Sequence, residues 1–315
     1  MFDPLPRLNA AVKRPSLPLV TSLLVFHVGC TDVTGPVLLP TDLCAGQPDI
    51  AVVTFEDVQL EAAVKNQLSL GVQDDITCRL ASTLPSLEAN FSGIARLTGI
   101  QNLTSADELL LAGNFITDLS PLGGSTVLAV LDLGENTITD ISALSGLTNL
   151  GALNLRKNSI NDISALSGLT SLLLLGLDSN SITDIGALSR LTSLESLILF
   201  NNSITDISVL RGFNSLIILD LGENPIADIS ALSSHLFLET IGLDNTDITD
   251  ISVLRNLEDL STISLNGNSR LTDIQPLLDH PTFGPGVTVY LLDTRVSCDD
   301  IAALVARKVT VISNC

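Results

Sequence analysis

The chain has 315 residues, a formal net charge of −20 and 45% hydrophobic residues. Because binding to nucleic acid or to an anionic lipid surface depends on lysine and arginine, this acidic balance argues against both kinds of partner. The three histidines, His27, His235 and His280, lie in no metal-binding or nucleophile–base motif, so the sequence predicts neither an enzyme nor a metal site or other cofactor.

Residues 1–29 have the pattern of a secretion signal. A basic stretch precedes an apolar run from Leu17 to Gly29 that is too short to span a membrane stably. The run ends in the sequence HVGC, which resembles a bacterial lipobox, and we therefore expect a lipid on Cys30. His27 stands where leucine is usual. An ordinary signal peptide cut nearby, with Cys30 removed or free, is the alternative interpretation.

A tether and a helix are expected next. Residues 30–43 contain proline and threonine and predict a short tether. Residues 44–83 predict an N-terminal cap, because apolar residues recur within them at helical spacing. The residues at this spacing are Val58, Leu60, Ala63, Val64 and Leu68.

From residue 84 to residue 285 the chain repeats a block of 22 residues. Such a fixed period is typical of a solenoid in which each unit stacks on the next. The LxL core of each unit alternates with period two and predicts a short strand with one face inward. One leucine column consists of Leu131, Leu153, Leu175, Leu197 and Leu219. Stacked neighbours can bury these leucines, at roughly 1.5–3 kcal/mol for each side chain.

Two polar columns accompany the leucines. The amide of an asparagine after each strand can satisfy backbone groups where the chain turns inward. This column is Asn114, Asn136, Asn158, Asn180, Asn202 and Asn224, with Thr246 in the next unit. An aspartate then precedes a short apolar stretch and predicts the N-cap of one or two tight turns on the convex side. This column is Asp118, Asp140, Asp162, Asp184, Asp206, Asp228 and Asp250. A calcium ladder is the alternative, although one carboxylate per unit provides few of the oxygens that calcium requires.

The pattern LxxLxxLxLxxNxIxDIxxLxxL resembles the internalin-like class of bacterial leucine-rich repeats, from about Leu84 to Asp273. The resemblance implies an α/β solenoid: a leucine-rich repeat horseshoe with a parallel β-sheet on its concave face and a helical N-terminal cap. Three local departures stand out. Thr246 replaces asparagine, one residue is inserted after Asn268, and His235 replaces leucine. For His235 we expect a tolerated core substitution, with Leu236 or Phe237 slipping into the vacated slot.

Residues 286–315 resemble a closing unit, with a strand, a turn, a helix around Ile301 to Ala306 and a final strand from Val309 to Ile312. Two cysteines flank each cap, so we expect disulfides Cys44–Cys78 and Cys298–Cys315, which suits an oxidising compartment. Four cysteines permit three pairings, and buried free thiols are the alternative.

The variable strand positions point to the concave face and are the candidate binding residues. They are Asp132, Asn154, Arg156, Leu174, Asp178, Ile198, Phe200, Ile218, Asp220, Asp244 and Tyr290. Four of them, Leu174, Ile198, Phe200 and Ile218, predict an exposed apolar patch with an acidic border, which is the usual mark of a protein-binding site. We expect Phe200 to be its anchor, because aromatic residues dominate many interfaces. A drifting surface with incidental apolar residues is the alternative.

The resemblance implies a non-enzymatic cell-surface protein that binds a protein or glycan partner through its concave face. A structural or scaffolding component of the cell envelope, without a dedicated ligand, is the second hypothesis, because a fold alone does not determine a function. We expect a monomer that is secreted to the bacterial cell envelope and touches a membrane only through a lipid anchor at Cys30.

Overall fold

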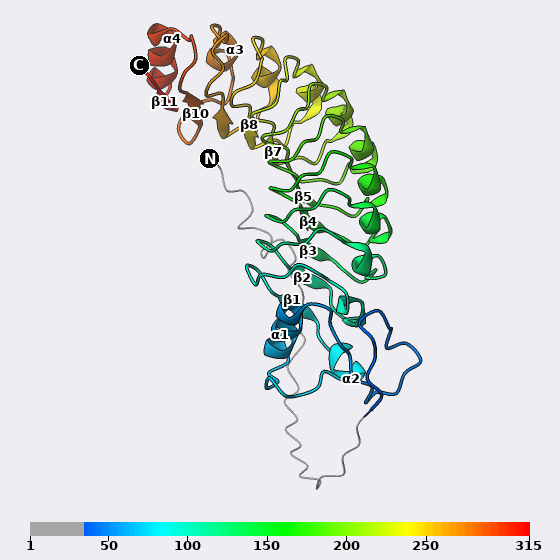
Figure 1. Ribbon diagram of the computed structural model, residues 1–315. Coiled ribbons are helices and arrows are strands. Elements are labelled where there is room, and N and C mark those ends of the chain that lie inside the picture. The colour runs from blue at the N-terminus through cyan, green and yellow to red at the C-terminus, as the bar shows by residue number, and fades with distance from the viewer. Residues whose placement is uncertain (1–34) are drawn as a thin grey trace.

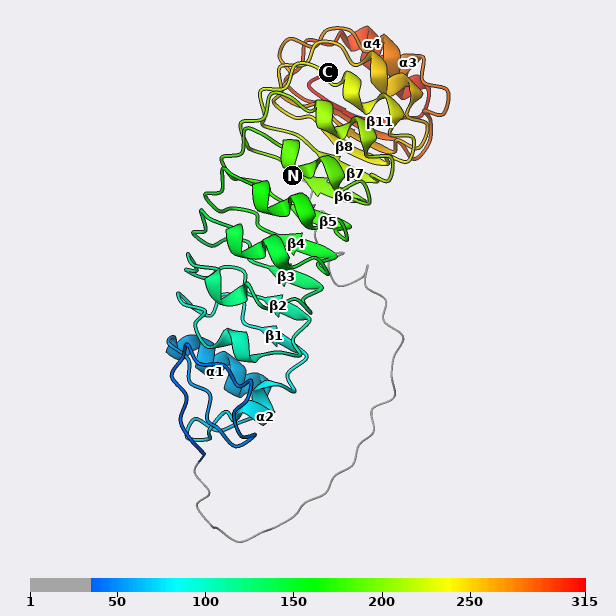
Figure 2. The same ribbon diagram turned by 90° about the vertical axis from the view of Figure 1, so that its right-hand side faces the viewer.

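Eleven short strands pair in parallel, in the order of the sequence, and form one sheet. The computed structural model describes residues 35–315, so the predicted signal segment 1–29 and Cys30 lie outside the described residues. The sheet lines the concave side of a curved solenoid, and short helical turns line the convex side (Figure 1). Seen from that side, the turns form a stacked row along the outer surface (Figure 2). The predicted solenoid with a parallel concave sheet is confirmed.

Each unit consists of a strand of three or four residues followed by a short helical turn. The strands are β1 (Ser86–Glu88), β2 (Glu108–Leu110), β3 (Val130–Asp132), β4 (Ala152–Asn154), β5 (Leu174–Gly176), β6 (Ser196–Ile198), β7 (Ile218–Asp220), β8 (Thr240–Gly242), β9 (Thr262–Ser264), β10 (Thr288–Leu291) and β11 (Thr310–Ser313). The α-helices are α1 (Val58–Gln67), α2 (Cys78–Ala81), α3 (Gln275–Leu278) and α4 (Cys298–Ala306). The 3₁₀ helices are η2 (Ile100–Asn102), η3 (Ser120–Leu122), η4 (Ser142–Gly146), η5 (Ser164–Gly168), η6 (Gly186–Arg190), η7 (Ser208–Gly212), η8 (Ser230–Ser234) and η9 (Ser252–Asn256).

The register of the sheet reproduces the period of the sequence. Leu153 pairs with Leu175 and Leu175 with Leu197, a step of 22 residues each time. The step from β9 to β10 is longer, because Thr262 pairs with Thr288, 26 residues later (288 − 262). One extra residue is the one inserted after Asn268, and the others lie between α3 and β10.

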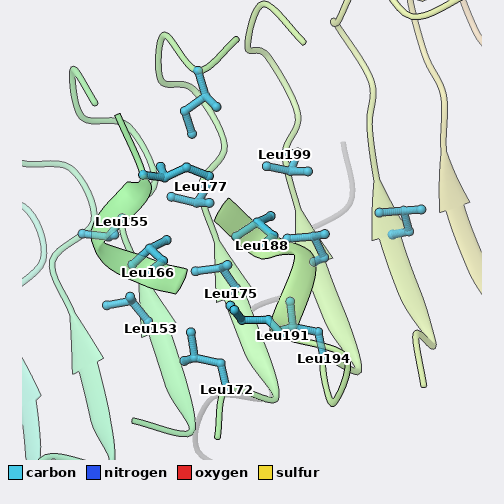
Figure 3. Close-up of a cluster of buried hydrophobic side chains, with 14 of the residues drawn as sticks. Leu153, Leu155, Leu166, Leu172, Leu175, Leu177, Leu188, Leu191, Leu194 and Leu199 are labelled. Atoms are coloured by element: carbon cyan, nitrogen blue, oxygen red, sulfur yellow. The ribbon is translucent and has the colours of Figure 1, made fainter. Parts of the chain in front are cut away.

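Leucine columns from successive units interlock to form a continuous core. Figure 3 shows part of it, where Leu153 and Leu175 stack along the sheet and Leu166 and Leu188 close the convex side. All four side chains are buried. Because each unit buries its leucines only against the units before and after it, the caps at both ends are needed to cover the terminal units.

The asparagine column satisfies buried backbone groups, as predicted. The side-chain amide of Asn136 donates to the carbonyls of Leu111 and Leu133, each at 3.0 Å. Its side-chain oxygen accepts the N–H of Ile116 at 3.0 Å. One asparagine therefore ties its own turn to the preceding unit. The same donor pattern occurs at Asn114, Asn158, Asn180, Asn202, Asn224 and Asn268.

The aspartate column caps the convex turns, but from one position earlier than expected. Asp140 accepts the backbone N–H of Ser142 at 2.8 Å, whereas the N-cap residue of η4 is Ile141. The free backbone N–H at the start of the short 3₁₀ turn needs an acceptor, and an aspartate two residues earlier, outside the helix, supplies it. This hydrogen bond holds the pKa of Asp140 below its usual value. Among residues 35–315 no group of three or more His, Cys, Asp or Glu side chains is arranged to hold a metal ion.

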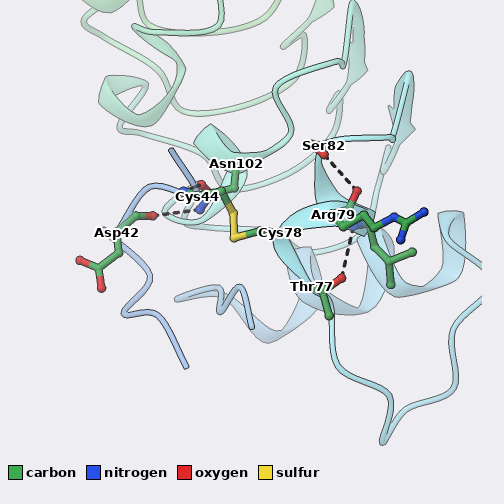
Figure 4. Close-up of a disulfide and its surroundings, with 8 residues drawn as sticks. Asp42, Cys44, Thr77, Cys78, Arg79, Ser82 and Asn102 are labelled. Atoms are coloured by element: carbon green, nitrogen blue, oxygen red, sulfur yellow. Dashed lines mark hydrogen bonds between the residues drawn. A yellow bond between two sulfur atoms is a disulfide. The ribbon is translucent and has the colours of Figure 1, made fainter. Parts of the chain in front are cut away.

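The N-terminal cap is held together by the predicted disulfide between Cys44 and Cys78 (Figure 4). Asn102 of the first convex turn accepts the N–H of Cys44 at 2.8 Å and donates to the carbonyl of Asp42 at 3.0 Å. The preceding Leu38 is buried and receives a hydrogen bond from the hydroxyl of Thr54 at 2.6 Å. The part of the predicted tether that is described, residues 35–43, is therefore packed against the cap rather than free.

The C-terminal cap also matches the expectation. Helix α4 and strand β11 close the solenoid, and Cys298 is bonded to Cys315. The side chain of Arg307, at the end of α4, donates to the carbonyls of Leu278 and His280 in the preceding unit. No helix in the described part of the chain, caps included, is long and apolar enough to cross a membrane.

The expected slip at His235 does not occur. His235 itself is fully buried in the leucine slot, and Leu236 and Phe237 are exposed. Its backbone N–H donates to Leu232 at 3.1 Å, as Phe213 in the same position of the previous unit donates to Leu210. The repeat therefore keeps its backbone geometry and accepts an imidazole, and neither ring nitrogen has a hydrogen-bond partner.

Candidate functional site

Three residues of each unit point to the concave face, and equivalent residues of successive units form three rows along the sheet. In each unit the middle residue of the strand is buried, so that its two neighbours point the other way. In β5, Leu174 and Gly176 flank buried Leu175, and Asp178 follows beyond buried Leu177. The same positions in other units hold all eleven predicted binding residues. Parallel pairing in register thus brings them to one surface, although they are separated by up to 158 residues in the sequence (Asp132 to Tyr290).

A polar network covers β3 and β4. Asp132 accepts a hydrogen bond from the side-chain amide of buried Asn154 at 2.8 Å. Arg156 forms an ion pair with Glu135 at 2.7 Å, and Lys157 reaches the same carboxylate at 3.2 Å. Burial raises the pKa of Asp132. The predicted Asp132, Asn154 and Arg156 therefore belong to one network, in which the two basic side chains already have acidic partners.

The predicted apolar patch is interrupted by a serine and is recessed. Leu174 and Ile218 stand in the same row of β5 and β7, on either side of Ser196 in β6. Both leucine and isoleucine are half-buried, and Ile198 is only 4% exposed. The expectation of an exposed patch is therefore wrong for Ile198. Neighbouring strands lie about 4.8 Å apart, and side chains on a concave surface lean together, so a bulky residue is covered by its neighbours.

Phe200 is the only aromatic residue of this patch, and its ring approaches a glycine of the next unit. Phe200 is half-buried, and a Cβ atom on Gly222 in the next unit would lie 3.0 Å from the Cδ2 atom of the ring. Gly222 thereby leaves room for the phenyl ring against the backbone. A hydrophobic group from a partner could contact the other side of the ring.

Carboxylates border the patch on the side of β7 and β8. Asp220 accepts the N–H of Gly222 at 3.0 Å, and Asp244 accepts the N–H of Asn266 at 2.7 Å. Burial, together with the nearby charges of Asp244 and Asp178, raises the pKa of Asp220 to about 6. The carboxylates of this border repel one another when they are charged, and a basic group from a partner would neutralise them.

The last predicted residue, Tyr290, is not part of this cluster. It lies in β10, in register with Ser264 of β9 and Ile312 of β11, and is half-buried. Strands β8 and β9 separate it from the patch around Phe200.

The sequence-based prediction of binding residues did not include two exposed aromatic residues. Phe91 and Phe115 are 72% and 65% exposed at the edge of the sheet near the N-terminal cap. Phe91 has a positive φ of 52°, and a Cβ atom on Gly113 in the next unit would lie 2.1 Å from its ring. A signal was present in the sequence. The position after the ladder asparagine is threonine or serine in the next four units, at Thr137 for example, whereas it is phenylalanine at Phe115.

Comparison with known proteins identifies the family. A family model for leucine rich repeats (two copies) matches residues 126–168 and 192–234. The solved structure of an internalin (InlF) from Listeria monocytogenes is 28% identical, with a TM-score of 0.65, and the match covers 82% of this chain and 90% of that one. Internalin C2 from the same bacterium is 36% identical, with a TM-score of 0.63, over 65% of this chain and 91% of that one. The chain belongs to the internalin-like family of bacterial leucine-rich repeat proteins.

A more distant structure agrees with the internalin-like architecture. A leucine-rich repeat protein from Leptospira interrogans is 19% identical over 73% of each chain, with a TM-score of 0.55, and shares the fold. No curated protein sequence matches this chain significantly. Membership of the internalin-like family supports a protein-interaction role at the bacterial cell surface.

Proposed function

We propose that this internalin-like protein is a non-enzymatic cell-surface receptor that binds a protein partner through the concave face of β5 to β8. The observation that carries the proposal is the half-buried Phe200, which follows Ile198 on the concave face and lies against Gly222, beside Asp220 and Asp244. Interfaces commonly combine such an apolar centre with a polar rim.

The charge of the surface narrows the class of partner. Asp220 has a raised pKa because it is desolvated beside Asp244 and Asp178, so a cation placed there would be stabilised. The basic residues that follow β4, Arg156 and Lys157, are by contrast already paired with Glu135. The partner therefore presents an apolar side chain for Phe200 and a lysine or arginine for the acidic border. A protein surface supplies both groups more readily than a glycan does.

The experiment is a capture from the cell envelope with residues 35–315 as bait. A bait that begins at Asp42 would lack Leu38, which is buried in the cap, so the longer piece is preferred. Both disulfides are kept oxidised, and bound proteins are identified after washing at moderate salt. Amide hydrogen exchange on the complex then maps the footprint.

The location of the protected amides distinguishes receptor function from the scaffolding hypothesis. Protection of β5 to β8 on the concave side supports receptor function. Protection confined to the convex turns, along the row of capped aspartates, would instead support a scaffolding role in the envelope. Phe237→Ala is the matched control for Phe200→Ala, because it removes an exposed phenylalanine from a turn outside the concave sheet.

We also propose that the mature protein begins at Cys30 and carries a lipid there. The support is the apolar run that ends in HVGC. Mass spectrometry of the mature N terminus tests this, since a lipid mass on Cys30 is expected, and a mature chain that begins at another residue would contradict it.

A further inference from the structure

The N-terminal cap carries an unusual concentration of exposed aliphatic side chains. Val37 and Leu39 are 70% and 67% exposed, and Leu43 and Ile50 are exposed as well. These four lie within 14 residues of chain (37 to 50) on the end of the solenoid where the described residues begin. Isolated exposed aliphatic residues need no explanation, but a group of four in one short segment does.

Local structure holds two of these side chains outward. Val37 pairs with Val52 in a parallel bridge, and the N–H of Leu38 donates to the carbonyl of Val52 at 2.9 Å. Because alternate side chains of an extended segment point to opposite sides, buried Leu38 leaves Val37 and Leu39 on the same outer side. The carboxylate of Asp42 accepts the N–H of Leu39 at 2.9 Å and fixes the turn that follows. The disulfide at Cys44 then anchors the segment to α2.

The charge of residues 35–50 indicates which kind of partner can bind the exposed aliphatic side chains. From Gly35 to Ile50 there is no lysine or arginine, and the charged residues are Asp42 and Asp49. A partner that binds here is therefore recognised by apolar contact, without help from a basic patch. The hydrophobic boundary of an uncharged bilayer has this chemistry.

The length of chain that precedes the cap brings this surface close to a membrane. Five peptide steps separate Cys30 from Gly35, and an extended chain spans at most about 3.6 Å per residue, so Gly35 lies within about 18 Å of the α-carbon of Cys30. If Cys30 is lipidated, as proposed above, the cap cannot leave the membrane surface by more than this distance.

We propose that the exposed aliphatic side chains of Val37, Leu39, Leu43 and Ile50 dock the N-terminal cap onto the lipid surface to which Cys30 is anchored. The proposal rests on the lipidation of Cys30, and it adds a second membrane contact to the lipid anchor that the sequence predicts as the sole one. The lipid supplies the attachment, and the cap surface fixes the direction of the solenoid. The stack of strands then extends away from the bilayer. Because neighbouring parallel strands are spaced by about 4.8 Å, β6 lies about 24 Å farther along the stack than β1. The concave face around Phe200 is thereby held away from the membrane and open to a partner.

The test measures how deeply a fluorescent probe on the full-length lipidated protein enters the bilayer. Leu39→Cys is labelled with a fluorophore after both disulfides have formed, and the protein is reconstituted into phosphatidylcholine vesicles that contain nitroxide-labelled lipid. Leu236→Cys is the matched control, because it replaces another exposed leucine, 54% exposed against 67% for Leu39, far from the cap. Thermal unfolding verifies that both variants fold. We expect at least twofold quenching of the probe at position 39 and none at position 236.

The outcomes separate docking from anchoring. Mass spectrometry and membrane fractionation of the same preparation report the lipid on Cys30 independently of the probe. Membrane-bound protein with a probe at position 39 that is as unquenched as the probe at position 236 would overturn docking and leave lipidation intact. A chain without lipid that stays in the soluble fraction would overturn both. Replacing part of the phosphatidylcholine by anionic lipid is expected to reduce quenching, because Asp42 and Asp49 are repelled, whereas an increase would contradict apolar docking.

Discussion

The ring of Phe200 lies across Gly222 of the following unit, and a Cβ atom on Gly222 would come within 3.0 Å of the ring. The repeat thus provides a flat backbone surface beneath the aromatic side chain that we place at the centre of the binding site. Both residues occupy the same row of the concave face, one unit apart (222 − 200 = 22 residues). The glycine therefore determines where the ring can sit.

Gly222→Ala should move the ring without disturbing the solenoid. The added methyl group is closer to the ring than most Cβ contacts, so Phe200 must rotate or lift away from the sheet. We expect the affinity for the captured partner to fall about tenfold, which corresponds to about 1.4 kcal/mol. Gly222 is buried, and the new Cβ atom would also lie 3.2 Å from the carbonyl oxygen of Asp244, so we expect a loss of about 1–2 kcal/mol in stability, too little to unfold the solenoid. Unchanged affinity would show that the position of the ring is irrelevant to binding.

The asparagine ladder gives a prediction about stability. Asn180→Ala leaves the carbonyls of Leu155 and Leu177 and the N–H of Ile160 without their side-chain partner. These hydrogen bonds are partly buried, and leaving them unmade is costly, so we expect a loss of about 1–3 kcal/mol in the free energy of unfolding. Urea unfolding followed by circular dichroism measures it.

Thr246→Asn is the matched control for the ladder. The threonine hydroxyl donates one hydrogen bond, to Leu243 or to Asn268, whereas an asparagine amide could donate to two carbonyls as Asn224 does. Thr246→Asn should therefore stabilise the protein by about 1 kcal/mol. If Asn180→Ala were harmless and Thr246→Asn destabilising, the ladder would have another role.

Sequence periodicity could predict the columns, and its failures have physical causes. The leucine and asparagine positions follow from a fixed period and from the need to bury apolar groups and satisfy backbone groups, whereas the disulfides could be predicted because two cysteines flank each cap. The exposure of Ile198 could not be predicted, because it depends on how closely side chains of adjacent strands crowd on a concave surface. His235 remained in its slot because backbone geometry outweighed hydrophobicity. The aspartates cap from one residue further away because a 3₁₀ turn is tighter than an α-helix.

His235→Leu should raise stability and change its dependence on pH. Burial lowers the pKa of His235 in the folded protein below the value of about 6.5 in the unfolded chain. The unfolded state therefore binds the proton more tightly, and stability falls as the pH drops from 7 towards 5. The leucine variant loses this slope and gains about 1–2 kcal/mol at pH 7, because the unpartnered ring nitrogens are removed.

His280→Leu is the control for the effect of an unpartnered imidazole. His280 is also buried, but its Nε2 atom lies 3.1 Å from the carbonyl of Leu257 and its ring stacks on Phe283. Its replacement by leucine should be neutral or destabilising. Equal stabilisation by both substitutions would mean that the missing hydrogen bonds of His235 are unimportant.

Asp220→Asn should stabilise the protein above pH 6 and have less effect at pH 4.5. The pKa of Asp220 is raised to about 6 in the folded state, against 3.8 as its ordinary value, so its neutral form favours folding. That contribution is complete below pH 4 and is lost as the pH rises through about 6. Melting temperatures of both proteins across this range measure the difference.

Asp140→Asn is the control with the opposite sign. Its pKa is lowered by the hydrogen bond from Ser142, so its charged form favours folding, and that contribution is lost as the pH falls below about 4. This variant should melt lower than the unmodified protein at pH 7. An Asp220→Asn variant with the same pH profile as Asp140→Asn would contradict the desolvated state of Asp220.

The most direct test of receptor function is the affinity of the captured partner for Phe200→Ala, measured by titration calorimetry beside Phe237→Ala. Removal of a central aromatic anchor is expected to weaken binding by at least thirtyfold, about 2 kcal/mol, whereas Phe237→Ala should bind like the unmodified protein. Equal affinity of all three proteins, or a loss confined to Phe237→Ala, would contradict a binding site on the concave face.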